Sequence, residues 1–250
     1  MLRVRQPAVA IALSAAALGG ATLAHADAPL GLSRCAKATE REESTRPRLL
    51  HSPAPAALRS LLGVLERPAT AADALPHSAI PRVGFTKLWV ASARLLATEG
   101  GTRYFVLPVV AAAAVPRACK VGVPASELRP LERAARAQAR GALSIVPVGA
   151  PEGVGAPGPA TRAEILAGDP FIAPQGTSHS GPAYGLVPNG VASLTIGGPV
   201  GPPVSATVTD DFFYTTVRFA AKAGEQRFTT RWLAASGAVI KTFATPAPVS

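Results

Sequence analysis

Alternation of apolar and polar residues near the C-terminus is the feature that most restricts how this chain can fold. In VSATVT, residues 204–209, every second residue is apolar, and serine or threonine stands between. Successive side chains of a β-strand point to opposite faces, so the pattern predicts a strand with one buried face. GVASLTI precedes this segment, and FFYTTVRF, RFTTRWL and AVIKTF follow it at regular spacing. Residues 184–250 are therefore expected to form about five strands in a small all-β, immunoglobulin-like sandwich.

A turn is predicted where the stretch YGLVPNGVASLTI, residues 184–196, leads into the first of these strands. Pro188 presets φ at the first central position of the turn, and Asn189 tolerates a positive φ at the second. Gly190 then releases the chain into the strand. The turn contains no nucleophile, general base or metal ligand, so its expected role is architectural.

The region before this sandwich mixes both kinds of secondary structure. Residues 53–67 predict a helix, because leucines at 58, 61, 62 and 65 lie on one helical face. A hairpin is expected at Gly100 and Gly101, a helix over 125–141 and a strand over 142–148. The chain is therefore predicted to be of the α+β class, with a mixed α+β region over residues 27–148.

Residues 149–183 are rich in Gly and Pro and predict a linker between the two regions. The linker contains a G-x-G-x-x-G pattern at residues 153–158, as in dinucleotide-binding proteins. That site needs backbone N–H groups at the start of a helix, and Pro157 and Pro159 each remove one. We therefore predict no cofactor.

The first 26 residues have the composition of a secretory signal peptide. Arg3 and Arg5 precede a small apolar core, and an A-x-A site places cleavage between Ala26 and Asp27. A retained membrane anchor is the alternative, although the apolar stretch falls short of the ~20 residues that a bilayer span needs. The expected location is secreted or extracytoplasmic.

The chain has two cysteines, Cys35 and Cys119. In an oxidising compartment the simplest expectation is one disulfide between them. It would close a loop of about 85 residues and contribute roughly 4 to 5 kcal/mol in the chain-entropy model. No C-x-x-C motif supports a redox role.

Basic residues give the chain a formal net charge of +10. Arg129, Arg133, Arg136 and Arg140 follow the helical period and predict one basic stripe. Such a stripe can meet an anionic envelope polymer or a membrane surface by electrostatics; the alternative is an ordinary solvated helix face. Nucleic acid is not an expected partner, because no aromatic residues interleave with the arginines.

No catalytic residue, cofactor site or metal site is predicted. After the leader the histidines are His51, His77 and His179, without the spacing of a zinc site. The pair Asp210 and Asp211 is interpreted as a turn. One enzymatic alternative stays open, a secreted serine-type hydrolase that uses Ser178 or Ser180 with a distant histidine.

Two segments, LLGVLERPATAADALP with SARLLATEGGTRYFVLPVV, and GLVPNGVASLTI with WLAASGAVIKTF, carry a resemblance. They resemble segments of uncharacterised exported proteins of high-GC Gram-positive bacteria. The resemblance implies a secreted, disulfide-bonded envelope protein and supplies no activity. The sequence thus favours a non-enzymatic cell-envelope protein of unknown function, a candidate binding or interaction module.

Overall fold

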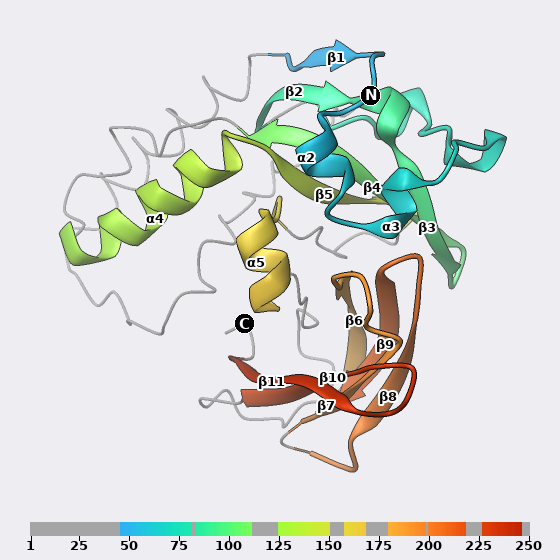
Figure 1. The fold of residues 1–250 in the computed structure, drawn as a ribbon, viewed down its shortest axis with the longest axis vertical. Helices are drawn as coiled ribbons and strands as arrows, with labels where there is room; N and C mark the ends of the chain where they lie inside the picture. The colour runs from blue at the N-terminus through green and yellow to red at the C-terminus, as the bar shows by residue number, and fades with distance from the viewer. Residues whose placement is uncertain are drawn as a thin grey trace, which may run out of the picture.

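The structure is a computed structural model that describes residues 46–81, 84–111, 125–150, 158–168, 180–198, 200–218 and 227–246. The predicted signal peptide with its Ala26/Asp27 cleavage site, both cysteines, Ser178 and His179 lie outside the described residues. The described residues are mostly β-structure, with eleven strands in two sheets and a few helices (Figure 1). Among the described residues, no helix combines the length and the apolar character needed to cross a membrane.

The N-terminal sheet has five strands arranged around the long strand β4. Its strands are β1 (Arg48–Leu50), β2 (Phe85–Trp89), β3 (Arg94–Glu99), β4 (Thr102–Ala111) and β5 (Ala142–Val148). Strand β5 pairs with one side of β4, whereas β3 and β2 share the other side. The predicted hairpin joins β3 to β4 through Gly100 and Gly101, which take the positive φ values of 56° and 82° that such a turn requires.

The prediction of one continuous helix over residues 53–67 is wrong. The structure has two one-turn helices instead, α2 (Ala56–Arg59) and α3 (Gly63–Glu66), because Leu62 is extended with φ −135° and ψ 135°. The four leucines at 58, 61, 62 and 65 are nevertheless all buried. The helical period therefore identified the buried side chains correctly, although it missed the break between the two helices.

The long helix and the short strand that follow were predicted more closely. Helix α4 (Ala125–Gln138) falls within the expected 125–141, and β5 has the expected bounds 142–148. Short 3₁₀ turns at Ala71–Asp73, His77–Ala79 and Val90–Ser92 complete the region. Figure 1 shows α4 projecting to one side of the N-terminal sheet.

Parts of the predicted linker, residues 149–183, are packed against the N-terminal sheet. Ala160 and Leu143 exchange backbone hydrogen bonds of 2.8 Å in each direction. Helix α5 (Arg162–Ala167) follows, and its first turn is closed by a capping box between Thr161 and Glu164. The buried Ile165 anchors α5 in the core.

The C-terminal sheet has six antiparallel strands in the order β11-β10-β7-β8-β9-β6. These are β6 (Ser180–Leu186), β7 (Ser193–Gly197), β8 (Val204–Thr209), β9 (Phe212–Arg218), β10 (Arg227–Leu233) and β11 (Val239–Pro246). Residues 204–207 of β8 pair with β7, and its last two residues pair with β9. Side chains from β6 to β10 share one buried cluster, so the sheet encloses a core in a sandwich-like way.

Alternation predicted this core well. Val204, Ala206 and Val208 belong to the cluster, while the serine and threonines between them are exposed. Phe228 and Trp232 of β10 are buried on one face, as expected. The immunoglobulin-like detail of the prediction is not confirmed, since the six strands form one continuous hydrogen-bonded order.

Residues 183–186 of β6 and 212–213 of β9 are buried on both faces of their strands. Phe213 faces the core of the C-terminal sheet, whereas its neighbours Phe212 and Tyr214 belong to the cluster that contains Tyr104 of β4. Figure 1 shows β6 and β9 between the N-terminal sheet and the strands β7, β10 and β11. One core is therefore shared by the two sheets.

Candidate functional site

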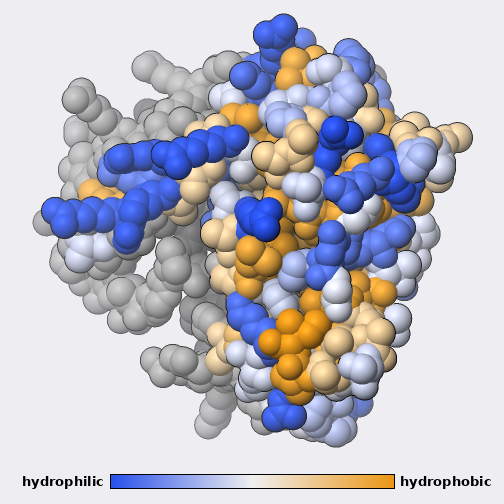
Figure 2. Space-filling model, in the orientation of Figure 1, coloured by the Kyte–Doolittle hydropathy of each residue, from blue (hydrophilic) through white to orange (hydrophobic). Residues whose placement is uncertain are grey.

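The four arginines of the predicted stripe are all exposed on α4 and the turn that follows it. Arg136 is 68% exposed and pairs with Glu132 at 3.2 Å, and Arg133 Nε donates to the carbonyl oxygen of Arg129 at 3.4 Å. Arg140 lies just beyond the helix end, where its N–H donates to the Ala137 carbonyl oxygen at 3.0 Å. Figure 2 shows long hydrophilic side chains along α4. The structure thus brings the predicted stripe together as one solvent-facing surface.

A cleft of about 200 Å³ lies where three parts of the chain meet, and we call it the junction cleft. The break between α2 and α3, the helix α5 and the turn between β6 and β7 each contribute to its wall. Its lining consists of Ser60, Leu61, Arg162, Ile165, Leu166, Pro188 and Asn189. Polar residues from both halves of the chain therefore line this one cleft.

Asn189 reaches the cleft from a turn that starts one residue later than predicted. The Val191 N–H donates to the Pro188 carbonyl oxygen at 3.3 Å, and Gly190 takes the positive φ of 93°. Asn189 therefore occupies the first central position, where no positive φ is needed. Its Oδ1 accepts a 2.7 Å hydrogen bond from the backbone N–H of Gly63.

The start of α3 is capped by this asparagine together with Asp211. Asp211 Oδ2 accepts from the Val64 N–H at 3.0 Å. The first N–H groups of a helix have no partner within the helix, so these two contacts satisfy two of them. Both caps come from the C-terminal sheet, which explains why the local sequence around Gly63 did not reveal the break.

Asp210 and Asp211 form the tight turn between β8 and β9, as predicted. Both have positive φ, 51° and 60°, and they connect the pairs Thr209–Phe212 and Val208–Phe213. Burial raises the pKa of Asp211, and the nearby Asp210 and Glu66 raise it further, against the N–H groups of Val64 and Gly63 that lower it.

Replacing Asp211 with alanine is expected to destabilise the protein by about 2 kcal/mol at pH 7. The change removes a helix cap and puts a residue that disfavours positive φ into the turn. Asp211→Asn keeps both properties and should stay within about 0.5 kcal/mol. Urea unfolding of the two variants checks this, and equal losses would contradict the capping role.

The raised pKa of Asp211 also predicts the direction in which the stability of the protein changes with pH. Because its pKa is higher in the folded state, the folded protein binds this proton more tightly, and its contribution to stability rises as the pH falls through that pKa. Asp211→Asn should lack this rise between neutral pH and about pH 4.

A second group of charged side chains surrounds Asp73, and its members pair with one another. Arg67 donates two hydrogen bonds of 2.8 Å to the Asp73 carboxylate, and the backbone N–H groups of Thr70 and Leu95 add bonds of 2.7 and 2.8 Å. Burial opposes ionisation, but these donors hold the pKa of Asp73 far below its usual range. Its oxygens are occupied, so this group serves structure.

Arg94 belongs to the same buried region, and its partners among the described residues are backbone carbonyl oxygens. It is 8% exposed and donates to the carbonyl oxygens of Arg67, Ala91 and Ala93. Burial lowers its pKa, because the guanidinium is removed from water. These bonds tie the segment after α3 to the start of β3.

All three tyrosines of the chain lie in one aromatic cluster between the two sheets. The Tyr104 ring centroid is 4.8 Å from that of Tyr184, 5.7 Å from that of Tyr214 and 5.3 Å from that of Phe212. Burial raises the pKa of Tyr104 to about 12 and raises that of Tyr184 as well. At neutral pH these hydroxyls stay protonated, so the cluster is a packing element.

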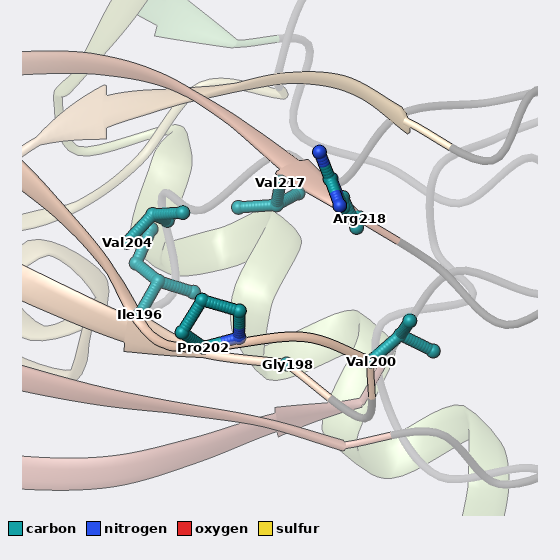
Figure 3. A pocket seen from close by; sticks show the side chains of 7 residues that line it. All are labelled: Ile196, Gly198, Val200, Pro202, Val204, Val217 and Arg218. Atoms are coloured by element: carbon teal, nitrogen blue, oxygen red, sulfur yellow. The ribbon is translucent and has the colours of Figure 1, made fainter.

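A second cavity of about 200 Å³ opens at the end of the C-terminal sheet (Figure 3). Ile196, Val204, Val217 and Pro202 supply apolar walls, and Arg218 is the charged residue beside them. Val217 and Arg218 are neighbours in β9, and Figure 3 shows their side chains pointing in different directions. Arg218 is thus the charged residue of a mainly apolar lining, whereas the junction cleft is lined by Ser60, Arg162 and Asn189.

The residues of the hydrolase alternative are not brought together in the described part of the chain. Ser180 is the first residue of β6, while Ser178 and His179 lie outside the described residues. His51 and His77 are exposed. Within the described ranges, no three His, Cys, Asp or Glu side chains form a group that could hold a metal ion.

Comparisons of the chain with protein-family models, with curated proteins and with solved structures find no match. The candidate sites therefore rest on their own geometry. The arginine stripe was predicted from local spacing. The junction cleft was not, and its only sequence signal was the Asn-Gly turn.

Proposed function

We propose that the protein is an exported, non-enzymatic cell-envelope protein that binds an anionic polymer or membrane surface through α4. The observation that carries the proposal is the exposure of Arg129, Arg133, Arg136 and Arg140 on one surface. The leader and the disulfide between Cys35 and Cys119 belong to the same proposal and are supported by the sequence alone. We also keep an immunoglobulin-like sandwich as the proposed class of the C-terminal strands.

The stripe has the dimensions of an electrostatic binding surface. With a rise of ~1.5 Å per residue, the positions from 129 to 136 extend over roughly 10 Å along α4, and Arg140 follows just beyond its end. Arg136 has a carboxylate partner in Glu132, and no ion pair joins the other three arginines to a described residue. Their charge is therefore available to an external anion.

The partner is expected to be held at the surface. The large apolar side chains that are exposed among the residues of described burial are Leu166, Val200, Val239 and Ile240, and none of the four belongs to α4. Membrane-inserting helices combine a basic face with exposed apolar side chains. Attraction through charge alone is screened by salt, so binding should weaken strongly as ionic strength rises.

The test compares two triple variants of the full chain with the same change in charge. One carries Arg129→Gln, Arg133→Gln and Arg140→Gln in the stripe. The other carries Arg46→Gln, Arg48→Gln and Lys87→Gln, three exposed positions around β1 and β2. Cosedimentation is measured with polyphosphate-coated beads and with phosphatidylglycerol vesicles.

The stripe variant should bind at least about tenfold more weakly than the control variant, and salt of about 0.5 M should release the wild type. Equal losses in both variants would show a response to net charge alone and would contradict the proposal. Retention that does not change with salt would contradict it too. Comparison of binding to the beads with binding to the vesicles shows which anionic partner is preferred.

A further inference from the structure

The junction cleft is lined by three polar residues that are far apart in the sequence, and it does not belong to the arginine stripe on α4. Ser60, Arg162 and Asn189 line it together with aliphatic side chains. We propose that this cleft binds a carboxylate carried on a small aliphatic body, such as a short branched acid or the C-terminal leucine of a peptide.

The polar groups of the cleft are donors suited to one anion. Asn189 Oδ1 is already used by the Gly63 N–H, so its amide N–H groups remain for a ligand. No carboxylate of a described residue pairs with Arg162; the nearby Glu164 instead accepts a 2.6 Å bond from the Thr161 N–H. An unpaired guanidinium next to neutral donors matches a planar carboxylate of single charge.

The rest of the lining matches an aliphatic body. Leu61, Ile165 and Pro188 supply apolar wall, and Leu166 remains 45% exposed as a large apolar side chain. A volume of about 200 Å³ holds roughly six or seven groups of the size of a water molecule. A carboxylate with a branched four-carbon body has this size.

The walls of the cleft are fixed before any ligand arrives. Lys241 Nζ donates to the carbonyl oxygens of Leu166 and Ala167 at 2.6 and 3.0 Å, which holds the end of α5 against β11. Gly168 allows this approach, since a Cβ there would lie 2.5 Å from Phe243 Cζ. The hydrogen bond from the Gly63 N–H at the start of α3 holds Asn189 in place. Ligand binding therefore needs to order few side chains of the cleft.

The test is an NMR titration of the full chain with four probes. Isovalerate and N-acetyl-leucine carry the carboxylate, and isovaleramide and N-acetyl-leucinamide are their uncharged counterparts. The two acids should produce saturable shifts at residues 60–61, 162–166 and 188–189, with at least about tenfold stronger binding than the amides. The ratio between the two acids distinguishes a free acid from a peptide end.

Arg162→Gln should weaken the binding of both acids at least about tenfold. This side chain is exposed and makes no hydrogen bond to a described residue, so the variant is expected to fold; its amide spectrum checks this. Arg59→Gln removes an equal charge from an exposed position outside the lining and should leave binding unchanged.

Binding of the amides as strong as that of the acids would overturn the proposal, and so would unchanged binding to Arg162→Gln. Shifts that centre on α4 would show anion binding at the arginine stripe and would overturn it as well. The stripe variant with three glutamines should bind the acids like the wild type. Failure of this proposal is therefore distinguishable from failure of the proposed function.

Discussion

Tyr184→Ala is expected to destabilise the protein by about 3 to 5 kcal/mol, the range measured when large aromatic side chains are removed from cores. Tyr184 is completely buried on β6, and its ring lies 4.8 Å from the Tyr104 ring centroid on β4. The change leaves a cavity at the contact between the two sheets. Unfolding in urea, followed by tryptophan fluorescence, measures the loss.

Tyr184→Phe is the matched control, because it keeps the ring and removes only the hydroxyl. It should cost no more than about 1.5 kcal/mol. An alanine variant as stable as the phenylalanine variant would mean that this contact contributes little. A double-mutant cycle that combines Tyr184→Ala with Tyr104→Ala would then measure the coupling between the sheets directly.

Asp73→Ala has the second large expected effect, also about 3 to 5 kcal/mol, because it leaves buried donors without their carboxylate. Asp73 is 4% exposed and accepts from Arg67, Thr70 and Leu95. Arg136→Ala is the contrasting control: it breaks an ion pair whose arginine is 68% exposed and should cost no more than about 0.5 kcal/mol.

The contribution of the Asp73 carboxylate to the stability of the protein should be lost in acid. Its pKa is lower in the folded state, so its contribution to stability is present above the ordinary value of about 3.9 and is lost as the pH falls below it. The stability difference between wild type and Asp73→Asn should shrink between about pH 5 and pH 2. A constant difference over this range would contradict the ionised, hydrogen-bonded carboxylate.

Local patterns predicted those parts of the fold that local forces determine. The alternation of residues 204–209, the Gly-Gly hairpin and strand β5 all appear as expected. Strand β6 was missed because its sequence, SGPAYGL, contains Gly and Pro. It lies at the edge of its sheet, and Pro is tolerated there because the missing N–H can face away from the partner strand.

Longer-range contacts account for what the sequence did not reveal. The helix over 53–67 is broken at Leu62, and the caps that stabilise the new start at Gly63 and Val64 come from residues 126 and 147 positions later. The junction cleft was missed for the same reason. The arginine stripe was predicted because the spacing of Arg129, Arg133 and Arg136 on α4, and of Arg140 just after it, depends only on the helical period.

The aromatic core shared by the two sheets also affects how the chain can fold while it is being synthesised. A polypeptide that emerges N-terminus first presents β4 with Tyr104 before Tyr184 and Phe212 have been made. Until then this apolar surface faces water, where it is prone to wrong association. We therefore expect the first half, truncated before β6, to aggregate or to be captured by holdase chaperones.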